Sequence, residues 1–520
     1  MQKEINPKRY SIFGRRILLA IIAFSSGAAI MIIELAGNRI IAPIFGNTLY
    51  TWTGLIGIIL LAMSGGYYFG GWVADKKPSY LVLAHYILVA GIYTIIIPFL
   101  HKAADTYFVR TSIIWGPAIA SIVLFTIPAF LLGSVTPFTV RLTSRLSEDK
   151  HVGISSGYIG MFSILGSVIG TFGTGFLLLP KIGVWEIFLA TGTILSFMAM
   201  VVYLCFLSTP IKKILGAAVV FFTISLLLFL MFTSKPVPPS YILFDKTNFY
   251  HRILVFRGPT LANGDFIKTI KLDNAVEGAQ YDKSHDIVLA SQKYWRLAKA
   301  YCPEIKRALF LGGGSFSMPE ALSSAYPGAE VEVVEIDPEV IEVGKRFFRL
   351  DNYRNVRPIA ADARRYLRQS RGRYDLIFGD AYHGVRTIPP HLVTLEFFHL
   401  ARQKLAEDGV YMMNIINAAE GEKAELFLSI IKTVSEVFEY VYVYAVYPND
   451  LKRVQNIIIV ACPKSQDSGS IMARNIQDSK LSRLLDTYIS PEKYNPSEYP
   501  FFTDNYNPVE YILARQATRN

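Results

Sequence analysis

The stretch LFLGGGSFSMPEA, from Leu309 to Ala321, decides how the second half of this chain folds. A short apolar run leads into three consecutive glycines, and a segment with helical spacing follows. This order is typical of the first unit of a nucleotide-binding α/β sheet, because glycines let the backbone approach a ligand closely. Ser315 follows the third glycine, and Ser317 stands where a dinucleotide fingerprint has its last glycine. A ligand without phosphates therefore fits this turn better than NAD.

Segments with strand and helix character alternate from Arg307 onward. The expected strands cover 308–313, 330–337, 356–362, 374–380 and 409–415, and the expected helices cover 318–326, 338–348 and 393–405. This alternation predicts α/β architecture with a doubly wound, largely parallel, Rossmann-like sheet of the methyltransferase type. Upstream of it, the runs 250–256 and 265–273 surround a Gly/Asn turn and predict a small antiparallel β domain.

Acidic residues end three successive strands of this expected sheet. Glu335 follows the glycines by about twenty residues, where a carboxylate can accept hydrogen bonds from ribose hydroxyls. Asp362 could accept from an adenine amino group, and Asp380 ends the next strand. Ligands of such sheets bind at the carboxyl ends of the strands, so the three side chains indicate one adenosine-binding crevice. The simpler alternatives are a plain glycine turn, Glu335 and Asp337 as solvated strand ends, and Asp362 as a helix N-cap.

The first part of the chain has the composition of a membrane protein. Apolar runs of about twenty residues, which is enough to cross a bilayer core of ~30 Å, cover 17–35, 53–74, 80–100, 113–133, 155–179, 185–207 and 214–232. They predict a multi-pass domain of about seven spans over 1–233, before a β-hairpin domain over 240–300 and a Rossmann-like domain over 301–520. Small residues in 63–75 and 166–175 indicate close helix approach.

The charge distribution argues for a membrane and against nucleic acid. Of the net charge of +11, residues 1–235 hold 17 Lys and Arg against 7 Asp and Glu, and the remainder is nearly balanced at 35 against 34. The positive-inside rule then places the N-terminus in the cytoplasm of a cell-membrane protein. An odd number of spans would place the C-terminal domain outside, unless one run is interfacial or re-entrant. Three widely separated cysteines indicate neither a metal site nor a disulfide framework.

Several motifs resemble one family. LFLGGGS, VEIDPEV, ADARRYL and YDLIFGDAY resemble the spermidine synthase (polyamine aminopropyltransferase) domain, and LDNAVEGAQYD is similar to that family's small N-terminal β domain. The segments IIELAGNRIIAPIFGNTLYTWTG and GGWVADKKP are similar to bacterial multi-pass proteins in which half of a major-facilitator-like bundle precedes such a domain. The resemblance implies decarboxylated S-adenosylmethionine as cosubstrate, no prosthetic group, a lipid bilayer and, from soluble relatives, a homodimer.

The resemblance also assigns roles to residues. A primary amine would attack the aminopropyl carbon next to the sulfonium, and Asp380 would serve as the base that takes the amine proton. Glu335 would bind the ribose, Asp362 the adenine, and Gln280 would lie near the donor. The residues expected to bind the donor are Gly312, Gly314, Ser315, Glu335, Asp337, Asp362, Ala363 and Gln280.

The chain departs from the family pattern at several positions. Ser315 stands where the family usually has an aspartate that helps hold the aminopropyl amine, and a hydroxyl cannot offer the same charge-assisted bond. The sequence VLAS replaces a Tyr-His-Glu stretch, His383 replaces a second aspartate, and His251 replaces a glutamine. His251, His285 and His383 could replace lost acidic groups, and the alternative is that each is a surface or packing residue.

Three functions are compatible with these residues. The first is a membrane-anchored aminopropyltransferase that uses putrescine or another amine as acceptor. The second is an S-adenosylmethionine-dependent methyltransferase, which would use the same sheet and the same acidic strand ends. The third is an inactive nucleoside-binding membrane or transport protein. The tail FFTDNYNPVEYI, with Asp504 and Glu510, could close over the site or form a packed turn.

Overall fold

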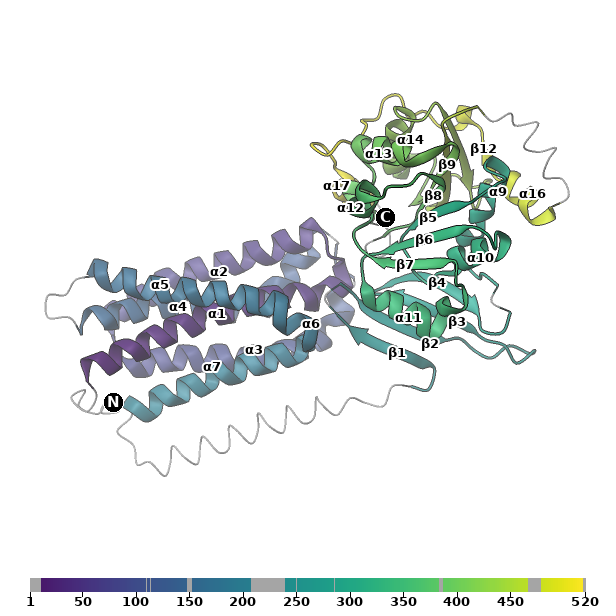
Figure 1. The fold of residues 1–520 in the computed structure, drawn as a ribbon. Helices are drawn as coiled ribbons and strands as arrows, with labels where there is room; N and C mark the ends of the chain where they lie inside the picture. The colour runs from purple at the N-terminus through teal and green to yellow at the C-terminus, as the bar shows by residue number, and fades with distance from the viewer. Residues whose placement is uncertain are drawn as a thin grey trace. The chain divides into compact units, whose positions relative to one another are not determined.

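The computed structural model describes residues 11–108, 110–112, 114–146, 152–206, 239–248, 250–284, 286–382, 387–465 and 478–517. It divides into two compact units, Met1–Pro238 and Pro239–Asn520 (Figure 1). The division coincides with the proline-rich segment around residue 236.

The described part of the first unit is helical. Six of its helical segments are long and apolar enough to cross a membrane. They are α1 (Ile12–Phe45), α2 (Leu49–Lys76), α3 (Tyr80–Phe108), α4 (Gly116–Ser144), α5 (Val152–Gly173), which continues through η2 (Thr174–Leu178) into α6 (Leu179–Lys181), and α7 (Val184–Phe206). They match the first six predicted runs, and the seventh, 214–232, lies outside the described residues.

Glycines bring the helices of the first unit close together, as the small-residue segments predicted. A Cβ on Gly66 of α2 would lie 2.1 Å from the carbonyl oxygen of Phe130 in α4, and the Ser134 hydroxyl donates to the Gly66 carbonyl over 2.9 Å. A Cβ on Gly166 of α5 would lie 1.9 Å from the carbonyl oxygen of Phe24 in α1. Backbones can approach this closely only where the side chain is absent.

The second unit begins with a small antiparallel sheet. Its strands are β1 (Ile242–Thr247), β2 (Arg252–Arg257), β3 (Ile267–Leu272) and β4 (Ala275–Tyr281), and they pair in chain order. One face of β2 and β3 is apolar and shares a core with the larger sheet that follows. The predicted antiparallel region is confirmed, with β1 and β4 flanking the two strands that the sequence indicated.

An eight-stranded sheet with the order β12-β10-β11-β9-β8-β5-β6-β7 forms the centre of the second unit. Its strands are β5 (Arg307–Leu311), β6 (Glu330–Glu335), β7 (Val356–Ala360), β8 (Tyr374–Gly379), β9 (Leu405–Asn417), β10 (Tyr440–Ala445), β11 (Gln455–Cys462) and β12 (Tyr488–Ile489). Strands β5 to β9 are parallel, and β11 runs antiparallel to both of its neighbours. Figure 1 shows β8, β5, β6 and β7 side by side. The doubly wound, Rossmann-like sheet is confirmed.

Both faces of this sheet are covered, as a parallel sheet requires. Side chains alternate along β5, so that Phe310 belongs to one apolar core while Leu309 and Leu311 belong to the other. The covering helices include α10 (Ser317–Ala325), α11 (Pro338–Phe348), α12 (Ala363–Gln369), α13 (Leu395–Lys404), α14 (Glu425–Ser435) and α17 (Val509–Ala517). The chain leaves β5 toward β6 on one side and returns to β8 on the other, so the strand order reverses at β5. Ligands of such sheets bind at this switch point, beyond the carboxyl ends of the strands.

Candidate active site

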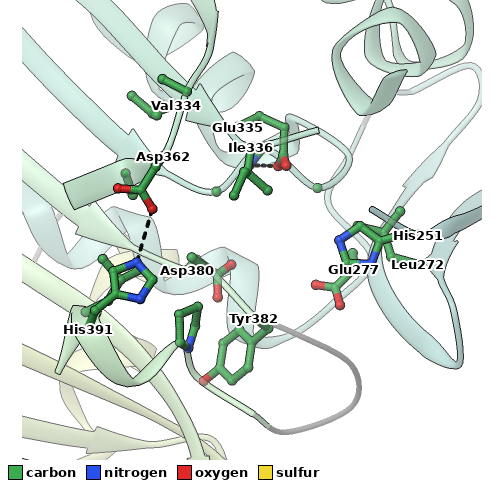
Figure 2. A pocket seen from close by; sticks show the side chains of 18 residues that line it. His251, Leu272, Glu277, Val334, Glu335, Ile336, Asp362, Asp380, Tyr382 and His391 are labelled. Carbon is green, nitrogen blue, oxygen red and sulfur yellow. Dashed lines mark hydrogen bonds and ion pairs between the residues drawn. The ribbon is translucent and has the colours of Figure 1, made fainter. Parts of the chain in front are cut away.

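A cavity lies at the carboxyl ends of β5, β6 and β8. Figure 2 shows its lining side chains, with Asp362 and His391 toward one end, His251 and Glu277 toward the other, and Asp380 between them. The predicted residues Gly312, Gly314, Glu335, Asp362, Ala363 and Asp380 all line the cavity.

The glycine turn after β5 brings the backbone to the floor of the cavity. Gly312 has φ +108°, and a Cβ there would lie 2.4 Å from the carbonyl oxygen of Asp380. Gly314 has φ +51°, and the turn ends at Phe316, which also has a positive φ of 59°. A φ of +108° is strongly unfavourable for any residue other than glycine, so position 312 favours a glycine. The turn therefore sets the close contact between the ends of β5 and β8.

Glu335, the last residue of β6, is held by the backbone around it. Its carboxylate accepts from the backbone N–H groups of Gly313 over 2.9 Å and of Asp337 over 3.0 Å. Burial raises the pKa of Glu335, and these two hydrogen bonds oppose the rise. The side chain is thus fixed at the strand end while it faces the cavity, an arrangement that suits a carboxylate accepting from vicinal hydroxyls.

Asp337 is fully buried and does not line the cavity. It caps α11 by accepting from the backbone N–H of Glu339, and the Asn248 amide lies 2.8 Å from each of its carboxylate oxygens. The alternative that Glu335 and Asp337 are solvated strand ends is wrong, because both are buried. Asp337 holds the loop that follows Glu335.

Asp362 combines the two roles that the sequence left open. One oxygen of its carboxylate accepts from the backbone N–H of Arg365 over 2.8 Å, which makes it the N-cap of α12. The other oxygen lies 3.1 Å from Nε2 of His391, a contact drawn in Figure 2. The side chain also faces the cavity beside Ala363, the first residue of α12.

Asp380 follows β8 and is held by the neighbouring strand. The Asn414 amide of β9 donates to the Asp380 carboxylate over 2.9 Å, and the Tyr382 hydroxyl donates to the Asn414 carbonyl over 2.7 Å. Asn456 of β11 in turn donates to the side-chain oxygen of Asn414 over 3.1 Å. Burial raises the pKa of Asp380 to about 6, with the Asn414 hydrogen bond opposing the rise. A carboxylate with this pKa is suited to accept a proton near neutral pH.

Besides Asp337, two further expected donor-binding residues do not line the cavity. Ser315 is fully buried against β4, where a Cβ on Gly278 would lie 2.0 Å from the Ser315 hydroxyl, and it hydrogen-bonds to the hydroxyl of Ser317. Gln280 is also buried, and its amide donates to Glu320 over 2.8 Å. Both residues connect β4 to the segment after the glycine turn.

The small sheet supplies a wall of the cavity that the sequence only partly indicated. His251, which was a candidate, lines it and lies 3.1 Å from Asp273 through Nδ1. Glu277 of β4 lines it as well and was not among the candidates. Its place in LDNAVEGAQYD was a usable signal, because the period of a strand predicts Glu277 on the same face as Ala275 and Ala279, which are buried. The other two candidate histidines, at positions 285 and 383, lie outside the described residues.

The C-terminal tail supports the cavity indirectly. The Asp504 carboxylate receives two hydrogen bonds of 2.6 Å from the guanidinium of Arg364 and one of 2.8 Å from the hydroxyl of Thr394. Arg364 also donates to the backbone carbonyl of His391, which lines the cavity. The tail therefore fixes the loop before α13, and neither Asp504 nor Glu510 lines the cavity.

Comparison with known proteins identifies the second unit. A family model for the spermine/spermidine synthase domain matches residues 295–467, which include the glycine turn, Glu335, Asp362 and Asp380. The second unit therefore contains a spermine/spermidine synthase domain.

Individual relatives cover different parts of the chain. A polyamine aminopropyltransferase of Vibrio vulnificus is 32% identical over 187 residues, which are 35% of this chain and 61% of that protein. Polyamine aminopropyltransferase 2 of Aquifex aeolicus is 24% identical over 445 residues, which are 82% of this chain and 85% of that protein. The crystal structure of a probable spermidine synthase from Corynebacterium glutamicum aligns with 20% identity and a TM-score of 0.43 over 52% of this chain and 98% of that one.

Proposed function

We propose that this chain is a membrane-anchored aminopropyltransferase that moves the aminopropyl group of decarboxylated S-adenosylmethionine onto a primary amine, putrescine or another. The observation that carries the proposal is the position of Asp380. It lies in the same cavity as Glu335 and Asp362, and it comes from the strand beside the glycine turn. A nucleoside held at Glu335 and Asp362 would present its sulfonium side toward Asp380.

The chemistry follows from the groups that face the cavity. The lone pair of a neutral amine attacks the carbon next to the sulfonium, the carbon–sulfur bond breaks, and methylthioadenosine leaves with the bonding electrons. An ammonium cannot attack, so a base must first take its proton, and Asp380 would do so. The lining carboxylates Glu277, Glu335 and Asp380 would also attract the cationic amine. They would stabilise positive charge in a partly desolvated site.

The Asp380→Asn variant tests this role. We expect product formation to fall by about 100-fold or more, as is typical for loss of a general base, while methylthioadenosine still binds. Isothermal titration calorimetry would measure binding and product analysis would measure turnover. Asp351→Asn, which removes an exposed carboxylate, is the control and should retain full activity. Full turnover by Asp380→Asn would contradict the assignment.

The proposal places the first unit in a lipid bilayer. Its helices expose large apolar side chains, with Leu61 69% and Ile164 66% accessible, and water would solvate such a surface poorly. From the Lys and Arg distribution we propose a cytoplasmic N-terminus in the cell membrane. Reporter fusions to each terminus would test the orientation and show on which side the second unit lies. Light scattering of the purified protein in detergent would test the expected homodimer.

A further inference from the structure

Glu277 differs from the other carboxylates that line the cavity. Glu335 accepts two backbone hydrogen bonds, Asp380 accepts one from Asn414, and Asp362 both caps α12 and contacts His391. Among the described residues, no hydrogen-bond donor contacts the side chain of Glu277. Its carboxylate therefore faces the cavity with its hydrogen-bonding capacity available to a ligand.

The charges around Glu277 favour a cation. Burial raises the pKa of Glu277 to about 8, and the negative charges of Asp380, Glu335 and Asp273 add to the rise. A carboxyl group is harder to ionise when its neighbours are negatively charged, and a cation between them favours the ionised forms. The ligand group that fits this end of the cavity is thus an ammonium with donors for more than one carboxylate.

Glu277 also occupies a defined place along the expected nucleoside. In Figure 2, Asp362 lies at the opposite end of the cavity from Glu277, with Glu335 and Asp380 between them. Backbone contacts fix this place, because a Cβ on Gly314 would lie 2.8 Å from the Glu277 carbonyl oxygen. With adenine near Asp362 and ribose near Glu335, the arm on the sulfonium would extend toward Glu277.

We propose that Glu277 binds the ammonium group at the end of the donor's three-carbon arm and thereby selects an arm that carries no carboxylate. This inference rests on the proposed function. S-adenosylmethionine carries a carboxylate beside the same ammonium, and Glu277, Glu335 and Asp380 would repel it. Ser315 faces β4 and does not line the cavity. Glu277, which belongs to β4, places a carboxylate at this point of the cavity.

Binding measurements on the full-length protein in detergent or lipid test the proposal. Three nucleosides are titrated separately: decarboxylated S-adenosylmethionine, S-adenosylmethionine, and methylthioadenosine, which has no charged arm. We expect Glu277→Gln to bind the decarboxylated donor about 10- to 100-fold more weakly, the range for one hydrogen bond to a charged group. Binding of methylthioadenosine should stay within about twofold, because the adenosine contacts remain. The preference for the decarboxylated donor over S-adenosylmethionine should shrink.

Two further variants sharpen the test. Glu277→Asp keeps the charge but shortens the side chain, and we expect it to weaken binding of the decarboxylated donor alone, by less than Glu277→Gln does. Asp286→Asn removes an exposed carboxylate after β4 and should change none of the three affinities. Equal losses for the decarboxylated donor and methylthioadenosine in Glu277→Gln would contradict the proposal.

Kinetics separate this proposal from the proposed function. A higher KM for the acceptor amine with an unchanged KM for the donor in Glu277→Gln would assign Glu277 to the acceptor and overturn the inference, while aminopropyl transfer itself would stand. A wild-type protein that binds the decarboxylated donor no better than S-adenosylmethionine, and that releases no methylthioadenosine, would overturn both.

Discussion

The side-chain amide of Asn414 donates a 2.9 Å hydrogen bond to the carboxylate of Asp380. Asn414 belongs to β9 and Asp380 follows β8, so the pairing of these two parallel strands determines the contact. The hydrogen bond favours the ionised form of Asp380, whereas burial disfavours it. The balance between these two effects sets the pH at which Asp380 can accept a proton.

We expect kcat/KM to fall as the pH drops through about 6, because Asp380 must be ionised to act as a base and burial raises its pKa to about 6. Asn414→Ala removes the hydrogen bond that opposes this rise. The acidic limb of the pH profile of kcat/KM should therefore move to a pH about one unit higher. Asn456→Ala, which removes only a donor to Asn414, should move it less. A limb that stays in place in Asn414→Ala would contradict this account of Asp380.

The glycine turn should not tolerate a side chain at its first position. Gly312→Ala would combine a φ of +108° with a Cβ 2.4 Å from the Asp380 carbonyl oxygen. We expect a loss of about 1–3 kcal/mol in the free energy of unfolding of the second unit, together with weaker nucleoside binding. Gly328→Ala is the control, because a Cβ there would meet nothing within 4 Å. Thermal unfolding with and without methylthioadenosine would measure both effects, and equal behaviour of the two variants would refute the prediction.

Glu320 should make stability depend on pH. Burial raises its pKa to about 8, so the folded protein keeps a proton that the unfolded chain releases near pH 4.5. Stability from this residue is therefore present at low pH, decreases as the pH rises from about 4.5 to 8, and then levels off. Glu320→Gln keeps the shape of the side chain without the charge. At pH 8.5, the melting temperature of Glu320→Gln should exceed that of the wild type. The difference should be about 2–4 °C for each kcal/mol by which the substitution raises the free energy of unfolding.

The comparison at pH 5 checks the sign of this effect, since Glu320→Gln and the wild type should then melt within about 1 °C of each other. Glu320→Ala leaves the Gln280 amide without its acceptor and should be destabilised at both pH values. A wild-type melting temperature that rises between pH 5 and 8.5 relative to Glu320→Gln would show that the charged form is favoured instead.

The tail should affect donor binding more than chemistry. Asp504→Asn weakens the two hydrogen bonds from Arg364 that hold the loop carrying His391. We expect a KM for the donor about 3- to 10-fold higher, as for loss of about 1 kcal/mol, and a kcat within about twofold. Asp408→Asn, which removes a surface ion pair with Lys464, is the matched control. A large fall in kcat with an unchanged KM would place the tail in the chemical step instead.

The strands that carry the site could be predicted from sequence because each combines an apolar run with a polar end. Glu335, Asp362 and Asp380 follow such runs, and the parallel order brings their ends to one edge of the sheet. The same patterns did not reveal that Ser315 faces β4, because the orientation depends on the space that Gly278 leaves. A turn residue has no periodicity from which its direction can be predicted.

The remaining contacts depend on pairing between distant segments. Asn414 was visible as a polar residue in an apolar strand, but its partner Asp380 depends on the order of β8 and β9. The contact between Arg364 and Asp504 joins residues 140 positions apart. Strands β10 to β12 were not predicted, although β10 and β11 are rich in aromatic or β-branched residues. Contacts between segments this far apart in the sequence leave no pattern in the residues near either partner.

Mass spectrometry tests aminopropyl transfer most directly. The purified full-length protein in lipid is incubated with a mixture of diamines and polyamines and with either decarboxylated S-adenosylmethionine or S-adenosylmethionine. We expect methylthioadenosine together with an amine heavier by one aminopropyl group, and only with the decarboxylated donor. S-adenosylhomocysteine together with a methylated product would contradict this expectation and identify a methyltransferase, and the absence of any product from both donors would contradict it in favour of a nucleoside-binding or transport role.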